Sequence, residues 1–386
     1  MEHTKLLYKL ITMAVLTAAL FFVCRIAYAG MRSLPYSREL LEPSNVALTN
    51  MFLEGKSPYS LDSLTYEKPA VNYDYPFFAS LVAAAISKIT HCAPITAHLF
   101  ISFISIIASG VIGVFMVKEQ SKTSVAPALA AILFMFCHWR YGYISAAPDD
   151  LGLLIMLLTL YAAVNKRIDH KPIWCAIGIT LCFYTKQYFV FVSVSIFIYM
   201  LLYSRKEAAK LFGWTILILS ASVAFITRYW PLYWLRSIVF TYLGTVQGGG
   251  DRLKTIIDQL KYLAFPFAAL FSLIVIAAFV GLRKLKKSHQ KLRNIRVEEN
   301  DPFVLSVINI IVMLLPLSML GCNDGAFISY FLQLWMHSVV VVAIICLERM
   351  DGDSHQIVFA GIYAGIAAFT IYFGFGKLPI HILTDE

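Results

Sequence analysis

Charged residues are scarce in this chain: Asp, Glu, Lys and Arg make up 14% of its 386 residues, against roughly 25% in a soluble globular protein. Hydrophobic residues make up 59%. This composition excludes a soluble globular domain, because too few polar side chains remain to cover its surface. It also excludes a disordered protein, which combines low hydrophobicity with high net charge. We therefore expect a polytopic membrane protein.

Cysteine is sparse and follows no pattern. The chain has seven Cys residues, none in a CxxC pair, and all lie within or at the edges of apolar runs. A zinc site or disulfide framework would show paired spacings, so we interpret the cysteines as small buried hydrophobic residues. We find no dedicated ligand set for a metal and expect no cofactor, although a divalent metal remains an option for the chemistry considered below.

The chain is rich in apolar runs of a length that can span a bilayer. They predict an all-α, polytopic transmembrane helix bundle of about eleven spans, which leaves no room for an appended soluble domain. We expect one integral-membrane domain over residues 1–386. The predicted spans are Leu10–Ala29, Ile95–Val117, Ser124–Cys137, Leu151–Val164, Pro172–Tyr184, Tyr188–Tyr203, Leu211–Thr227, Leu263–Leu282, Phe303–Leu320, Ile328–Leu347 and Ile357–Phe373.

The placement of Pro76–Ile89, an apolar stretch of 14 residues, decides the topology. If it lies on the outer face without crossing, most Lys and Arg residues face the cytoplasm, including the dense group at Arg283–Arg296, as the positive-inside rule favours. The net charge of +9 then reports orientation and contact with membrane lipids, with no nucleic-acid partner. The two long loops, 30–94 and 228–262, lie on the outer side.

Each outer loop is expected to contain a helix. In the first loop, Ser44 is a predicted N-cap and Gly55 a predicted stop for a juxtamembrane helix. Glu42 precedes it, held extended by Pro43 and kept ionised by the helix dipole; alternatively, Glu42 and Glu39 are only capping or solvated charges. The second loop contains an amphipathic helix that begins after Gly250, which either packs on the bundle or forms a mobile gate.

Ionisable residues gather where the spans meet the outer surface, and membrane-embedded charges are generally functional. The alternative interpretations are snorkelling for the cations and helix capping for the acids. We see no internal repeat and no charge in the middle of the longer spans, which argues against an ion-coupled transporter. The residues at these junctions are Arg140, Asp149, Asp150, Lys186, Arg228, Asn323 and Asp324.

Several segments in order resemble the GT-C superfamily of polytopic glycosyltransferases, and within it the bacterial relatives of dolichyl-phosphate-mannose protein mannosyltransferases. EGKSPY and NYDYPFF in the first outer loop, PDDLGL, KQYFVF and GAFISYFLQ are similar to segments of that family. The resemblance spans roughly residues 6–345.

The resemblance implies inverting transfer of a sugar from a polyprenyl-phosphate donor to a glycan, lipid or protein acceptor. The reaction would occur on the outer face of a bacterial inner membrane, with an acidic residue of the first loop as base. Glu42 takes that position, with Glu39 as a rival. The implied substrate-binding residues are Lys186, Arg140, Arg228, Asp149, Asp150, Asn72, Asp74 and Tyr330.

The chain departs from the family pattern at two positions. The Asp that usually neighbours the acid is Leu41, and the Arg of the family's RPD segment is Ala147, so that Arg140 would take over its role or the role would be absent. Two other functions remain open: a flippase or transporter for lipid-linked saccharides, and an outer-face polymerase or ligase that uses a diphosphate-linked oligosaccharide.

Overall fold

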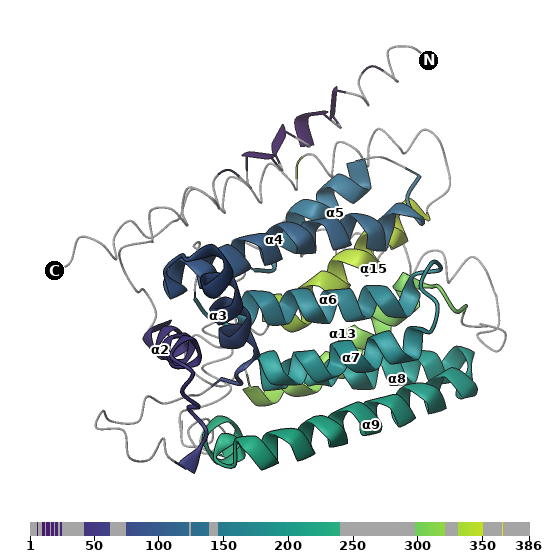
Figure 1. Cartoon of the computed structure of the whole chain (residues 1–386). Helices are drawn as coiled ribbons and strands as arrows, with labels where there is room; N and C mark the ends of the chain where they lie inside the picture. Colours follow the sequence, from purple (N-terminus) through teal and green to yellow (C-terminus); the bar gives the residue numbers. More distant parts are fainter. Residues whose placement is uncertain are drawn as a thin grey trace. The chain divides into compact units, whose positions relative to one another are not determined.

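Figure 1 shows the computed structural model of the chain. The structure describes residues 42–61, 75–122, 125–138, 146–239, 298–320 and 331–349, together with scattered positions between Leu6 and Cys24 and Gly365. Within these residues all regular secondary structure is helical, as the sequence predicts.

The predicted apolar runs that fall in the described ranges all form helices. Leu10–Ala29 is described only at scattered positions, and Leu263–Leu282 and Ile357–Phe373 lie outside the described residues, as does the helix predicted after Gly250. The helices in the described runs are α4 (Pro94–Lys118), α5 (Val125–Phe136), α6 (Asp149–Val164), α7 (Lys171–Thr185), α8 (Val192–Tyr203), α9 (Arg205–Tyr229), α13 (Pro302–Leu320) and α15 (His337–Glu348).

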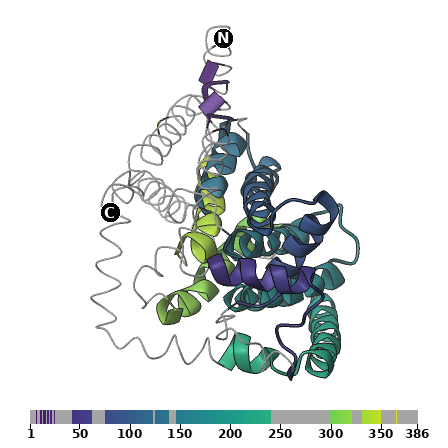
Figure 2. The ribbon, with the colours of Figure 1, turned by 60° about the vertical axis from the view of Figure 1, so that its left-hand side comes forward.

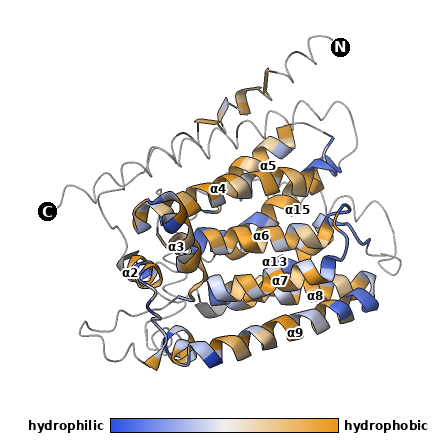
Figure 3. Cartoon of the chain, in the orientation of Figure 1, coloured by the Kyte–Doolittle hydropathy of each residue, from blue (hydrophilic) through white to orange (hydrophobic). Residues whose placement is uncertain are grey.

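Two of the described helices, α4 and α9, are long and apolar enough to cross a membrane. The number of eleven spans therefore stays a prediction. In Figure 3 the helices are apolar over most of their length, and hydrophilic residues gather at connections such as those from α6 to α7 and from α8 to α9. This distribution is typical of helices whose ends meet water and whose middles do not.

Local sequence explains where several helices begin. Ser204 caps α9 by accepting a hydrogen bond from the backbone N–H of Glu207 at 3.3 Å, and the S-x-x-E spacing is that of a capping box. Asp301 precedes α13, and its Oδ1 accepts from the N–H groups of Phe303 and Val304. Both caps satisfy backbone donors that have no partner within the helix.

The juxtamembrane helix of the first outer loop is α2 (Glu42–Leu53), and it starts earlier than predicted. Ser44 lies inside the helix, so its predicted role as N-cap is wrong. Pro43 is the second helical residue, a position where the missing N–H costs nothing and the fixed φ favours the helix. Gly55 follows the helix with a φ of 69°, which a residue without Cβ adopts readily, so the predicted stop is confirmed.

The chain divides into two compact units, and α4 contributes to both, with Ile106 the last residue of its part in the second unit. The second unit comprises Tyr28–Ile106 and Tyr143–Arg252. In it α6, α7 and α9 run side by side, and α2 and α3 (Phe78–Thr90) lie at one end of them (Figure 1). Figure 2, turned by 60°, shows α2 running across this end.

The first unit comprises Met1–Ala27, Ile107–Gly142 and Leu253–Glu386. Its described part contains the rest of α4, α5, α13, α15 and the short π-helix η5 (Phe331–Met336). Buried side chains connect α13 to α15: Asn309 Nδ2 donates to Ser338 Oγ at 2.9 Å. At the other end of α15, Arg349 Nη2 donates to Gln120 Oε1 at 3.2 Å and lies 3.7 Å from Asp301.

Close packing of α6 against α7 depends on a glycine. A Cβ at Gly178 would lie 2.1 Å from Thr159 Oγ1 and 3.0 Å from its Cβ. Thr159 is β-branched and buried, and its hydroxyl donates to the Ile155 carbonyl at 2.6 Å, so it has little freedom to move away. Only glycine at position 178 permits this helix–helix distance.

We predict that Gly178→Ala destabilises the protein by about 1–3 kcal/mol, because the added methyl overpacks the α6–α7 contact. Gly213→Ala is the matched control: no described atom lies within 4 Å of a Cβ there, and the change inside a helix should be neutral or stabilise by up to about 1 kcal/mol. Thermal unfolding in detergent measures both. Equal stability of the two variants would contradict this packing.

Candidate active site

A break in the helical chain places Lys186 at one end of the second unit. Helix α7 ends at Thr185, Lys186 has an extended backbone, and the 3-10 helix η2 (Gln187–Phe191) follows before α8 begins. Where a helix is interrupted, the backbone N–H and C=O groups at the break have no partner within that helix. The break brings a single lysine to the end of the unit at which α6 begins.

Lys186 forms a buried ion pair with Asp149, the first residue of α6. Its Nζ lies 2.5 Å from Asp149 Oδ1, and each side chain is only 5% exposed. Tyr188 Oη donates to the same carboxylate oxygen at 3.1 Å. Burying either charge alone would be costly, so the pair and its hydrogen bonds compensate each other.

Two tyrosine rings flank the ammonium group. Lys186 Nζ lies 4.7 Å from the centroid of the Tyr75 ring and 5.0 Å from that of Tyr188. Cation–π attraction to each ring adds to the ion pair and grows as the site is desolvated. Tyr75 comes from the NYDYPFF segment of the first outer loop, so the structure joins that segment to KQYFVF.

Asp150 points to a different partner. Its Oδ2 accepts a short hydrogen bond from Ser102 Oγ of α4. The capping interpretation of Asp149 and Asp150 is wrong, because Pro148 occupies the N-cap and the cap carries no side-chain hydrogen bond. The snorkelling interpretation of Lys186 is also wrong, because its side chain is buried.

The ion pair has a chemical consequence for any anionic ligand. Lys186 and Asp149 together carry no net charge, so the pair by itself offers little attraction to a phosphate. A phosphate that binds Lys186 must displace the carboxylate or bring a further cation into play. The pair can therefore act as an exchangeable site, in which one oxyanion replaces another on the same ammonium group.

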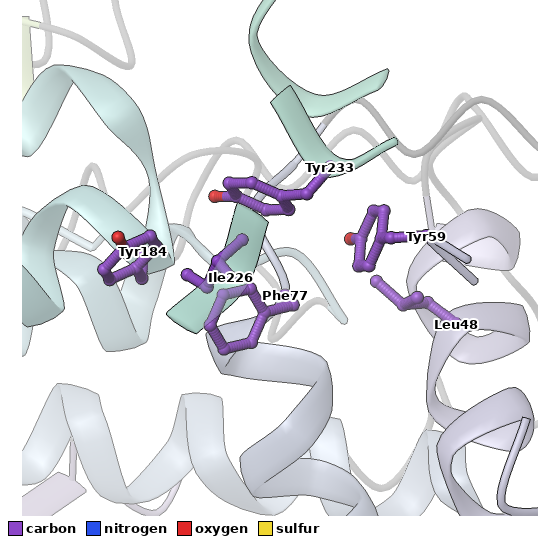
Figure 4. Close-up of a cluster of buried hydrophobic side chains, with 6 residues drawn as sticks. All are labelled: Leu48, Tyr59, Phe77, Tyr184, Ile226 and Tyr233. Carbon is purple, nitrogen blue, oxygen red and sulfur yellow. The ribbon is translucent and has the colours of Figure 1, made fainter. Parts of the chain in front are cut away.

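The second unit also contains an aromatic cluster (Figure 4), in which Tyr184 stands two residues before Lys186 in the chain. In it Phe77 contacts Trp230 at 4.8 Å between ring centroids, Tyr233 at 5.6 Å and Tyr184 at 5.4 Å. The contacts with Trp230 and Tyr233 are edge-to-face and that with Tyr184 is tilted, and edge-to-face pairs add to the stability gained from burial alone. The buried members are Leu48, Tyr59, Phe77, Tyr184, Ile226 and Tyr233.

The pKa of Tyr233 is shifted strongly in this cluster. Burial raises the pKa of its phenol well above the usual value, and the neighbouring Tyr59 and Tyr184 raise it further. Burial disfavours the charged phenolate, so Tyr233 stays neutral at physiological pH.

Three hydrogen bonds fix the start of the second outer loop. The N–H of Leu232 donates to the Tyr59 carbonyl at 3.0 Å, and Arg236 Nη1 donates to the Pro58 carbonyl at 2.5 Å. Gln187 Nε2, next to Lys186 in the chain, donates to the Ser237 carbonyl at 2.5 Å. The EGKSPY segment, the KQYFVF segment and the short π-helix η3 (Leu235–Val239) thus meet at one place.

Not every predicted site residue can be placed. The backbone of Glu42 begins α2, but its side chain lies outside the described part of the chain. Arg228 is described and exposed in the last turn of α9, and it makes no described contact with Lys186 or Asp149. Outside the described residues lie Glu39, Asn72, Asp74, Arg140, Asn323, Asp324 and Tyr330.

Several residues around the ion pair were not predicted. Tyr75, Gln187 and Tyr188 stand within the quoted NYDYPFF and KQYFVF segments, so the segments were informative and their individual members were not singled out. Ser102 lies within an apolar run, on one helix face with His98, Ser105 and Ser109 at i, i+4, i+7 and i+11 spacing, and this polar stripe was a signal that the sequence analysis did not use. In the described part of the chain no three His, Cys, Asp or Glu residues group together as a metal site would require.

No family model and no curated protein matches the sequence. A solved structure is similar in fold: the archaeal oligosaccharyltransferase AglB from Archaeoglobus fulgidus, in complex with an inhibitory peptide and a dolichol-phosphate. The TM-score is 0.53 at 13% sequence identity, over 94% of this chain and 55% of that one. This chain thus spans about half the length of AglB. The likeness supports a GT-C-like fold.

We predict that Lys186→Met destabilises the protein by about 3–5 kcal/mol, because Asp149 would remain buried without its counter-charge. Removing both charges, as in Lys186→Met with Asp149→Leu, should recover much of that loss. Unfolding midpoints of the single and double variants measure the coupling. A double variant as unstable as the sum of the two single variants would show that the pair is not coupled.

Proposed function

We propose that the chain is an integral-membrane glycosyltransferase of GT-C type. It transfers a sugar from a polyprenyl-phosphate donor to a glycan, lipid or protein acceptor on the extracytoplasmic face. The observation that carries this proposal is the buried Lys186–Asp149 pair, held by residues of three quoted segments, at the end of the second unit where α2 begins with Glu42.

The chemistry needs a base and a site for the leaving phosphate. Glu42 is the proposed base, with Glu39 as its rival: a carboxylate takes the proton of the acceptor hydroxyl as it attacks the anomeric carbon. The bond from that carbon to the phosphate oxygen breaks, and the lipid phosphate leaves with the electron pair. Cations that contact the phosphate stabilise it as this charge develops.

Lys186 is the first choice for that contact. The donor phosphate would replace the Asp149 carboxylate on Nζ, and the released Asp149 would remain bonded to Tyr188. Arg140 and Arg228 are proposed as further cations that balance the negative charge of the donor phosphate. Asp150, Asn72, Asp74 and Tyr330 are proposed to bind the sugar or the acceptor, as the family resemblance implies.

The fold likeness supports a lipid-phosphate donor in general terms. AglB was solved with a dolichol-phosphate and a peptide, which are a lipid phosphate and a candidate acceptor class. The apolar composition and the two helices long enough to span support an integral membrane protein. We propose that it lies in a bacterial inner membrane, as the family resemblance implies, with the site on the outer side, as the distribution of Lys and Arg indicates.

A second candidate is the transfer of a whole oligosaccharide from a lipid carrier. The neighbour is by name an oligosaccharyltransferase, and this specific observation favours a ligase over a transporter. The two candidates differ in the donor: a single sugar on a monophosphate against an oligosaccharide on a diphosphate. Assays of the purified protein with both donor types separate them.

We predict that Glu42→Gln lowers the turnover number of reconstituted protein at least about 100-fold with a polyprenyl-phosphate sugar, because general base catalysis contributes that much. Glu54→Gln is the control, since Glu54 lies just after the same helix, exposed and paired with Lys56. Transfer of radiolabelled sugar to product is the measurement.

Undiminished transfer by Glu42→Gln would move the base to Glu39, Asp74 or Asp150. Translocation of labelled lipid without any glycosylated product would overturn the enzyme in favour of a flippase. Product formed only from the diphosphate donor would favour the ligase.

A further inference from the structure

Buried polar side chains hold α2 against its neighbours in the second unit. Asn45 Nδ2 donates to the Ala146 carbonyl at 3.1 Å. Thr49 Oγ1 lies 2.8 Å from His98 Nε2 of α4 and 2.9 Å from the Asn45 carbonyl. Ser80 Oγ of α3 donates to that carbonyl at 3.3 Å. All four side chains are at most 5% exposed.

The Thr49 hydroxyl has one hydrogen and three possible acceptors: the Asn45 carbonyl at 2.9 Å, the Ser80 carbonyl at 3.4 Å and, in one tautomer, His98 Nε2 at 2.8 Å. When the hydroxyl donates to a carbonyl, it accepts from a protonated His98 Nε2; in the other tautomer it donates to His98. The partners in this network come from α2 itself, α3, α4 and the loop before α6.

Packing alone does not require these residues. Burying an amide, a hydroxyl and an imidazole costs free energy that apolar side chains of similar size would not. What hydrogen bonds add is direction, because they weaken steeply when distance or angle changes. The network therefore fixes both the rotation and the position of α2 along its axis.

The network joins the two halves of the proposed site. Asn45 lies three residues after Glu42, one turn into α2, and Ala146 lies three residues before Asp149. The Asn45–Ala146 bond therefore ties the first turn of α2 to the loop that leads into the ion pair.

We propose that Asn45 and His98 are positioning residues, which hold the start of α2, and with it the base, in register with the Lys186–Asp149 pair. Neither touches the substrate: both act through Glu42, so this inference rests on the proposed function. A small displacement of a base from its proton can lower the rate of transfer about 100-fold. Binding of the donor phosphate depends on Lys186 and should not change.

The test is a double-mutant cycle of Glu42→Gln and Asn45→Ala in the reconstituted protein, with radiolabelled transfer as the readout. We expect Asn45→Ala alone to lower the turnover number at least 10-fold and to leave the Kd for polyprenyl phosphate within twofold. In the Glu42→Gln background it should cost less than threefold, because the base through which Asn45 acts is already lost.

His98 gives an independent arm. His98→Ala should resemble Asn45→Ala, and His98→Gln should restore transfer in large part, since a side-chain amide can either donate to Thr49 Oγ1 or accept from it. Thr180→Ala is the stability control: Thr180 is buried in the same unit, and among the described residues its hydroxyl donates to the Ala176 carbonyl of its own helix at 2.9 Å. It should lose stability without losing turnover.

Equal loss from Asn45→Ala in both backgrounds would overturn the proposal, as would weakened donor binding with unchanged turnover. Failure of the proposed function would give a different result from failure of this inference. In that case the wild-type protein forms no product, or Glu42→Gln keeps the wild-type rate before Asn45 is changed.

Discussion

The buried ion pair between Lys186 and Asp149 is the interaction on which the described site depends. Burying two charges is favourable only if each is compensated, and here the Tyr188 hydroxyl and the rings of Tyr75 and Tyr188 add to the ion pair itself. This requirement explains why α7 breaks at Lys186: the break delivers the lysine to the first turn of α6. The pair also brings KQYFVF, PDDLGL and NYDYPFF together, three segments that lie far apart in the chain.

Composition and periodicity were sufficient for the class of fold and not for the contacts. The apolar runs predicted the described helices, and Gly55 predicted the end of α2. The start of α2 was missed because Ser44 is a good N-cap residue, while Pro43 at the second helical position allows an earlier start. The acids of α6 were open to a capping interpretation, because only tertiary structure decides whether a carboxylate at a helix start turns to its own backbone or to a lysine 37 residues away.

The polar residues inside apolar runs were the hardest to predict. His98 and Ser102 lie in a long apolar helix and share one buried face with Ser105 and Ser109, at the i, i+4, i+7 and i+11 spacing of a helix. Their partners, Thr49 and Asp150, lie on other elements. A membrane protein satisfies such groups through contacts distant in sequence, since lipid offers no hydrogen bonds. Once the fold is known these bonds are informative, because they connect α4 to α2 and to the first turn of α6, where the ion pair lies.

The location of the lipid phosphate tests the central claim most directly. A cryo-EM map of the protein in lipid nanodiscs with added polyprenyl phosphate would show it. We expect phosphate density within hydrogen-bonding distance of Lys186 Nζ, with the Asp149 carboxylate displaced and the lipid tail against the apolar helices. Phosphate density at the opposite end of the second unit, near Lys171 and Arg205, with the ion pair intact, would contradict the proposed site.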